Sequence, residues 1–219
     1  MLTTPKPSFS SSYTEGEPLL LAFIAAVTSL SIILSNLINF LVISQLRKTR
    51  SSTKILYFSL STSDFVCGLS ASFHVLSTYE QSLPFEHWLC SALGYLLTSA
   101  NIVLTCTMAA LSLERCLIIT RPLDNRRFVN RTYSTWTVIC IWLFGYLLAI
   151  WGFFTRLGNL YRFNEQIYIC ALAIHRNLVT AIFNLAFLFG FAGTIICTCW
   201  LTIFVHARRH HRRRKNRYS

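Results

Sequence analysis

Three stretches of this chain contain no Asp, Glu, Lys or Arg: residues 19–46, 132–155 and 177–207. A helix of about 20 apolar residues spans the hydrocarbon core of a bilayer, so each stretch is long enough to cross it. Two further apolar stretches, 55–79 and 89–119, carry only isolated charged or His side chains. Only helices and closed barrels satisfy backbone polar groups in hydrocarbon, and continuous apolar runs favour helices. The sequence therefore predicts an all-α, multi-pass membrane protein.

Charge is scarce and unevenly placed. Asp, Glu, Lys and Arg make up 13% of the residues, against roughly 25% in a typical soluble domain. The net charge of +12 would also suit a nucleic-acid-binding protein. However, the basic residues gather in alternate loops, at 47–54, 115–131 and 208–217. This pattern is typical of loops that stay on the cytoplasmic side of a membrane, so we expect no nucleic-acid partner.

The charge pattern predicts an N-terminus outside, five crossings and a C-terminus in the cytoplasm. No basic segment precedes the first apolar run, so the first helix is expected to serve as its own signal anchor. The Asn-x-Ser/Thr sequon at Asn130 falls on the cytoplasmic side, and we expect it to carry no glycan. The predicted organisation is an extracellular tail at 1–17, helices at 18–46, 55–79, 89–119, 132–155 and 177–207, and a basic cytoplasmic tail at 208–219.

The cysteines divide according to this topology. Cys90 and Cys170 are predicted on the extracellular side, where disulfides form and persist. We expect them to be joined, which would tie the start of the third helix to the loop before the fifth. Most other cysteines fall inside predicted helices, where a free thiol behaves as a small apolar side chain.

Single residues along the apolar stretches form an ordered series of motifs. Ser35-Asn36 lies in the first helix, and Leu60-Ser61-Thr62-Ser63-Asp64 in the second. Glu114-Arg115-Cys116 closes the third, Arg121-Pro122-Leu123 follows it, and Trp142 lies midway along the fourth. Together with Cys90, this order and spacing resembles the rhodopsin-like (class A) family of G-protein-coupled receptors. The resemblance implies a five-helix bundle taken from a seven-helix receptor fold, truncated after the fifth helix.

The resemblance implies roles for several of these residues. Asn36 and Asp64 would form a polar core, which lines a sodium pocket in the family. Leu104 replaces a Ser that often completes that pocket, so we expect a water-mediated contact and no metal site. Glu114, Arg115 and Leu123 would act in G-protein coupling, with the Arg paired to its neighbouring acid at rest. As an alternative, an Arg at a helix end can simply extend to the membrane interface.

The ligand site is less defined by the sequence. Amine receptors of the family carry an Asp at the position that Leu97 occupies here, so an amine salt bridge from the third helix is not expected. Thr98, Asn101 and Asn184 are the candidates to line a ligand pocket with Leu97. Polar residues of membrane helices also commonly bond neighbouring helices, which is the alternative for all three.

The predicted function is that of a receptor for an unknown extracellular ligand, which would couple to a heterotrimeric G protein only when completed by further helices. The alternative is a five-helix interaction isoform that binds full-length receptors and alters their trafficking. We expect neither an enzyme nor a cofactor. The basic tail is expected to contact anionic lipids. The predicted location is the plasma membrane, with retention in the endoplasmic reticulum as the alternative for a truncated chain.

Overall fold

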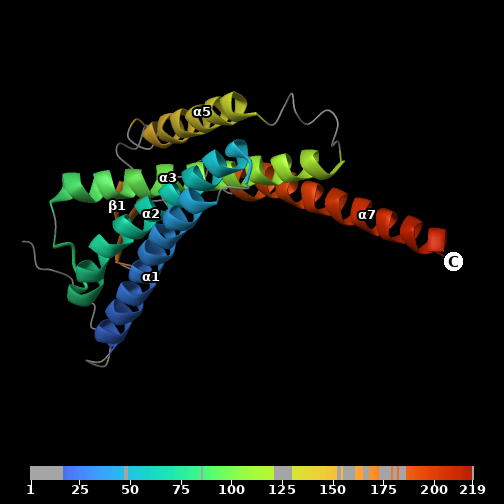
Figure 1. Cartoon of the computed structure of the whole chain (residues 1–219). Coiled ribbons are helices and arrows are strands. Elements are labelled where there is room, and N and C mark those ends of the chain that lie inside the picture. Colours follow the sequence, from blue (N-terminus) through green and yellow to red (C-terminus); the bar gives the residue numbers. More distant parts are fainter. Residues whose placement is uncertain are drawn as a thin grey trace, which may run out of the picture.

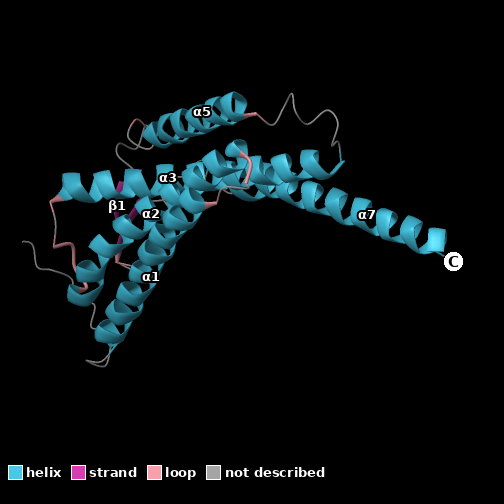
Figure 2. Ribbon diagram, viewed as in Figure 1, coloured by secondary structure: helices cyan, strands magenta, loops and turns pink. Residues whose placement is uncertain are grey.

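The computed structural model describes the backbone of part of the chain, namely residues 17–46, 49–84, 86–120, 130–151, 154, 161–164, 168–172, 179, 182 and 186–218. In this part, five long helices dominate (Figures 1 and 2). They are α1 (Glu17–Gln45), α2 (Ser51–Glu80), α3 (His87–Thr120), α5 (Arg131–Ile150) and α7 (Gly193–Tyr218). A π-helix, η3 (Ala186–Ala192), leads into α7. Two short antiparallel strands, β1 (Tyr161–Asn164) and β2 (Ile169–Leu172), form a hairpin that the sequence analysis did not predict.

Helix α3 is the central element of the bundle. It packs against α2, α5 and α7, and against both strands near its His87 end. Helices α1 and α2 lie alongside each other, and α7 extends past α3 toward the C-terminus (Figure 1). Because α3 touches nearly every other element, its side chains decide how closely the bundle can pack.

Four described helices are long and apolar enough to cross a membrane: Pro18–Gln45, His87–Thr120, Arg131–Ile150 and Gly190–Arg209. Helix α2 is not among them, although a crossing was predicted at 55–79. Nine of its eleven buried residues are Ser, Thr or His, whereas large apolar side chains such as Phe58 and Leu69 are exposed. A helix packed within a membrane bundle typically turns small polar side chains inward and large apolar ones outward.

Many hydroxyl groups on these helices donate to a backbone carbonyl one turn earlier in the same helix. Thr28 donates to the Ile24 carbonyl at 2.8 Å, and Ser31 donates to the Val27 carbonyl at 2.7 Å. The same pattern recurs at Thr62 and Thr198. A hydroxyl in an apolar surrounding costs free energy unless it is hydrogen-bonded, so this pairing allows polar residues at membrane depth.

The observed helix bounds differ from the predicted ones by more than two residues in α2, α5 and α7. Helix α2 begins four residues before the predicted start at 55, because its first turn is held by contacts to α3. Helix α5 ends at Ile150 rather than 155, where the Trp151 backbone N–H bonds back to the Leu148 and Ala149 carbonyls. The fifth helix, predicted at 177–207, is regular α-helix from Gly193 and continues to Tyr218, so most of the predicted basic tail has a helical backbone.

Gly145 permits a close approach between α5 and α3. A Cβ atom at this position would lie 2.7 Å from Cγ2 of Val103 and 3.3 Å from the Ser99 carbonyl oxygen. Ala149, one turn later, is also buried against the bundle. This small-x-x-x-small pair places the two backbones closer than larger side chains would allow.

We predict that Gly145→Ala lowers the thermal stability of the detergent-solubilised protein, because the added methyl overlaps Val103. Overpacking of this kind costs about 1–3 kcal/mol. Gly190→Ala is the matched control, since a Cβ there meets nothing within 4 Å. Adding Val103→Ala to Gly145→Ala should restore part of the loss, and no difference between the two glycine variants would contradict the assignment.

Candidate functional site

The Thr120 end of α3 holds a buried carboxyl group. Glu114 is 6% exposed, and its Oε1 accepts hydrogen bonds from Ser52 Oγ at 2.8 Å and Thr53 Oγ1 at 3.0 Å. Its Oε2 is buried and has no hydrogen-bond partner among the described residues. Glu114 therefore fastens the first turn of α2 to α3, which explains why α2 begins as early as Ser51.

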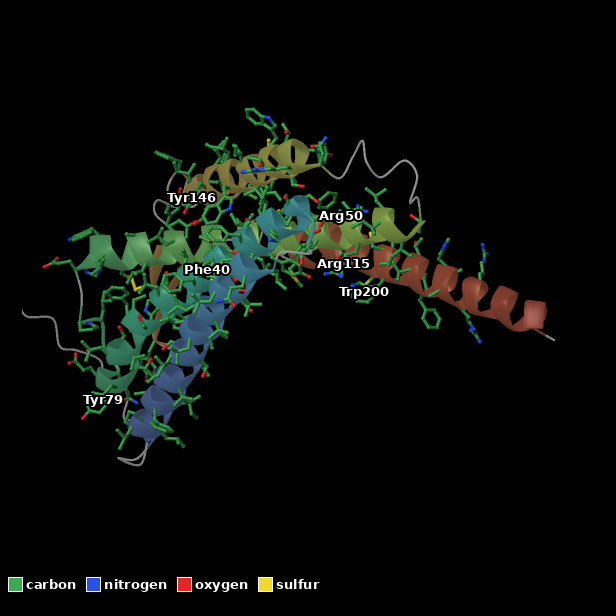
Figure 3. All side chains as sticks on the ribbon, viewed as in Figure 1. Phe40, Arg50, Tyr79, Arg115, Tyr146 and Trp200 are labelled. Carbon is green, nitrogen blue, oxygen red and sulfur yellow. A yellow bond between two sulfur atoms is a disulfide. The ribbon has the colours of Figure 1, made fainter. Side chains whose placement is uncertain are left out.

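Arg115, the next residue, turns to a different partner. Its guanidinium donates a hydrogen bond to the Tyr57 hydroxyl on α2 and lies 5.8 Å from the centre of that ring. The side chain is exposed, at the end of the bundle where Figure 3 labels it. The expected pairing of Arg115 with Glu114 is thus not the arrangement seen here: the acid binds two hydroxyls of α2 and the Arg binds a phenol.

Asn36 and Asp64 line the same groove as Arg115. The groove has a volume of about 430 Å³ and runs along α1 and α2, with Tyr57 and Lys54 also in its wall. Asn36 is buried, and its amide donates to the Ile32 carbonyl at 2.9 Å within α1. The structure therefore brings the two predicted polar-core residues to one groove without a direct hydrogen bond between them. Among the described residues, no group of three or more His, Cys, Asp or Glu side chains could hold a metal ion.

A disulfide joins Cys90 at the start of α3 to Cys170 in β2, with a Cα–Cα distance of 5.2 Å. The predicted pairing is confirmed. Both cysteines are buried, at 2% and 0% exposed. The Cys170 backbone N–H also donates to Nδ1 of His74 on α2, at 3.5 Å. The hairpin is therefore held to two helices, covalently to α3 and by a hydrogen bond to α2.

Tyr161 of β1 fixes the other strand of the hairpin. Its ring is 2% exposed, and its hydroxyl donates to the Ala149 carbonyl at the end of α5, at 2.6 Å. Its ring also packs edge-on against Tyr95 of α3, with centroids 6.1 Å apart. Burial raises the pKa of the Tyr161 phenol to about 12, although a hydrogen bond from Thr98 opposes this rise. The phenol thus stays protonated and able to donate at any physiological pH.

Three of the candidate ligand residues, Leu97, Thr98 and Asn101, lie on α3. Thr98 lies beside the Tyr161 phenol of the hairpin. The Asn101 amide donates to the Leu97 carbonyl of its own helix at 2.8 Å, and Asn101 is exposed. Asn184 lies outside the described residues, as does Leu123 of the predicted coupling set.

Trp142 takes part in a polar contact among three helices. Its Nε1–H donates to Ser59 Oγ on α2 at 2.9 Å. Ser59 in turn lies 3.5 Å from the Thr107 hydroxyl on α3. Trp142 therefore links α5 to the α2–α3 pair, consistent with the helix-packing role that its position predicts.

The sequence analysis missed several residues of this site. Ser52 and Thr53 precede the apolar stretch and were predicted to belong to a loop, although a Ser-Ser-Thr run just before a span is a possible first helical turn. Tyr57 and His74 lie within the span and carry no motif. Tyr161 lies in a segment without helical or alternating pattern, so no local signal identifies it as buried.

Comparison with known proteins agrees with this arrangement. A model of the 7 transmembrane receptor (rhodopsin family) matches residues 35–219. The chain belongs to this family. It is similar to the Probable G-protein coupled receptor 21 of Mus musculus, at 24% identity over 160 residues, which is 73% of this chain and 46% of that protein.

Other receptors of the family are also similar. The Gastrin/cholecystokinin type B receptor of Mus musculus is 29% identical over 126 residues, covering 57% of this chain and 28% of the receptor. The Gq-coupled rhodopsin of Mizuhopecten yessoensis is 23% identical over 176 residues, or 77% of this chain and 35% of that protein. The chain spans about half the length, or less, of these curated relatives. It is a rhodopsin-family, multi-pass membrane protein built as a partial receptor bundle.

We predict that Thr53→Val lowers stability, because it removes one of the two hydrogen bonds to the buried Glu114 carboxyl while keeping the side-chain shape. Loss of a partner by a buried polar group costs about 1–3 kcal/mol. The measurement is the thermal midpoint in detergent, with the exposed neighbour Ser51→Ala as control. In a Glu114→Gln background, Thr53→Val should lower the thermal midpoint by a different amount than in the wild type, as expected for two groups in direct contact. If Thr53→Val lowers the thermal midpoint equally in both backgrounds, the two substitutions are additive and the contact is refuted.

Proposed function

We propose that this chain forms the first five helices of a receptor that senses an extracellular ligand and couples to a heterotrimeric G protein. The membership of the rhodopsin family supports a receptor. The observation that carries the coupling proposal is the pair at the Thr120 end of α3. Glu114 is buried and anchored to α2, whereas Arg115 is exposed and, among the described residues, donates to Tyr57.

This arrangement suits a contact residue. Glu114 fixes the end of α3 relative to α2, so the position of Arg115 is set by a buried bond. The Arg115 side chain itself lies at the surface, and releasing the Tyr57 hydroxyl would leave all five N–H donors of the guanidinium available to another chain. Leu123, nine residues after Glu114, is the proposed apolar contact of the same surface.

The hairpin supports the ligand side of the proposal. The Cys90–Cys170 disulfide, His74 and Tyr161 hold β1 and β2 against the opposite end of α3. An entering ligand would meet this fixed hairpin. We propose Leu97, Asn101 and Asn184 as residues near its path, and the engaged Thr98 as a support for the hairpin. The proposed location is the plasma membrane, with the hairpin outside and α7 ending in the cytoplasm.

We predict that purified residues 1–219, in lipid vesicles with a heterotrimeric G protein, do not accelerate guanine-nucleotide exchange over empty vesicles. The proposed receptor activity belongs to a longer receptor, because this chain covers about half of its relatives. The transcript should next be read beyond the codon for Ser219. If it encodes further apolar spans, the extended protein should accelerate exchange.

In that extended protein, Arg115→Ala should reduce exchange by about tenfold or more, equivalent to about 1.4 kcal/mol of lost interaction. Lys54→Ala, from the wall of the same groove, is the control and should leave exchange nearly unchanged at equal surface levels. Exchange that survives Arg115→Ala would contradict the coupling role.

A second candidate function is association with other receptors. The groove along α1 and α2 is lined by Asn36 and by the half-buried Asp64, whose carboxyl group could meet a partner within the membrane. We predict that the chain co-purifies with a co-expressed full-length rhodopsin-family receptor and changes its surface level. Asp64→Leu should weaken this association, whereas Ser51→Ala should not. Absence of both co-purification and any change in surface level would exclude this function.

A further inference from the structure

Tyr57 of α2 makes two kinds of contact with Arg115 of α3. The Tyr57 hydroxyl accepts a hydrogen bond from the Arg115 guanidinium, and the guanidinium carbon lies 5.8 Å from the centre of the Tyr57 ring. A cation within about 6 Å of an aromatic ring is attracted to the electrons of its face. One side chain therefore engages both the N–H donors and the positive charge of Arg115.

Tyr57 lies in a part of α2 that is held on both sides. Its neighbour Leu56 is buried, and the buried Ser59 accepts the hydrogen bond from Trp142 of α5. The first turn of α2 is bound to the buried Glu114 carboxyl. The Tyr57 side chain itself is half-buried in the wall of the groove along α1 and α2. The phenol is thus a fixed acceptor.

The carboxyl groups near this contact are placed differently. Glu114 accepts hydrogen bonds from two hydroxyls of α2. Asp64 lines the same groove as Arg115, but it lies about two helical turns, or roughly 10 Å, beyond Tyr57 along α2. The described partner of Arg115 is therefore an uncharged phenol. A guanidinium makes a stronger hydrogen bond to a carboxylate than to a neutral acceptor, so a protein that presents a carboxylate can displace the phenol.

We propose that Tyr57 is a positioning residue, which holds Arg115 against α2 in the resting protein and restrains its contact with the G protein. The restraint on coupling rests on the proposed function, whereas the hold on the side chain does not. While the hydrogen bond is formed, the guanidinium stays beside the Tyr57 ring. When a partner's carboxylate replaces the hydroxyl, the guanidinium leaves the groove and the N–H donors turn to the partner.

Two substitutions divide the contact into its parts. Tyr57→Phe removes the hydroxyl and keeps the ring, whereas Tyr57→Leu removes both. The net free energy of one hydrogen bond corresponds to about a two- to tenfold change in the ratio of held to released side chain. An exposed cation–π contact corresponds to about a further two- to fivefold change. Arg115 should therefore be released least in the wild type, more in Tyr57→Phe and most in Tyr57→Leu.

The first experiment measures this release in the purified chain in detergent. Phenylglyoxal modifies accessible guanidinium groups, and peptide mass spectrometry gives the rate of modification at each arginine. The rate at Arg115 is divided by the rate at Arg131, which is exposed at the start of α5 and reports any general loosening. The ratio should rise about two- to tenfold in Tyr57→Phe and further in Tyr57→Leu. Tyr133→Phe is the matched control, because it removes the hydroxyl of an exposed tyrosine on α5.

The control should leave the ratio of the two modification rates unchanged. A ratio that stays at the wild-type value in both Tyr57 variants would overturn the proposal. A ratio that rises as much in Tyr133→Phe as in Tyr57→Phe would overturn it as well.

The second experiment measures the consequence in the extended protein of the proposed function. Tyr57→Phe should raise ligand-independent nucleotide exchange about two- to tenfold at equal surface levels, and adding Arg115→Ala should abolish the increase. Wild-type exchange that Tyr57→Phe leaves unchanged would contradict the restraint. If the extended wild type shows no exchange at all, the proposed function fails, and the modification ratio still decides whether Tyr57 holds Arg115.

Discussion

The structure depends on the burial of polar groups against α3. In a hydrocarbon surrounding there is no water to satisfy a hydroxyl, an amide or a carboxyl, so each must find a partner in the protein. Helix α2 meets this demand by turning its Ser, Thr and His side chains inward, where Glu114, Trp142 and Cys170 provide partners. The apolar side chains then face outward. The bundle is thus held by small polar contacts inside rather than by a large apolar core.

Buried polar groups hold neighbouring elements at both ends of α3, but the two ends differ. At the His87 end, the disulfide and two hydrogen-bonded side chains, His74 and Tyr161, fix a hairpin over the bundle. At the Thr120 end, a single buried acid anchors α2 and leaves Arg115 at the surface. One end is covalently closed and the other is held by hydrogen bonds that can be exchanged. In the proposed receptor function, the fixed hairpin end would face the ligand and the hydrogen-bonded end would face the G protein.

Hydropathy indicates where helices lie because membrane helices are long, apolar and bounded by charge, although the fifth predicted stretch, 177–207, is regular α-helix only from Gly193. The ends were less predictable, since they are set by contacts between helices. Ser51 to Thr53 looked like a loop until Glu114 supplied their partner. The turn at Trp151 and the π-helix before Gly193 are local backbone solutions that hydropathy does not encode.

The sequence by itself determined the family, the all-α membrane architecture and the Cys90–Cys170 pair, because these depend on composition, order and spacing along the chain. The tertiary structure alone decided which side chains meet. Glu114 binds α2 rather than its neighbour Arg115, the Cys170 backbone binds His74, and Trp142 donates to Ser59 across two packed helices. The physical reason is that each of these partners lies on another element, far away in sequence. Their meeting depends on how closely α3 lets the other helices and the hairpin approach.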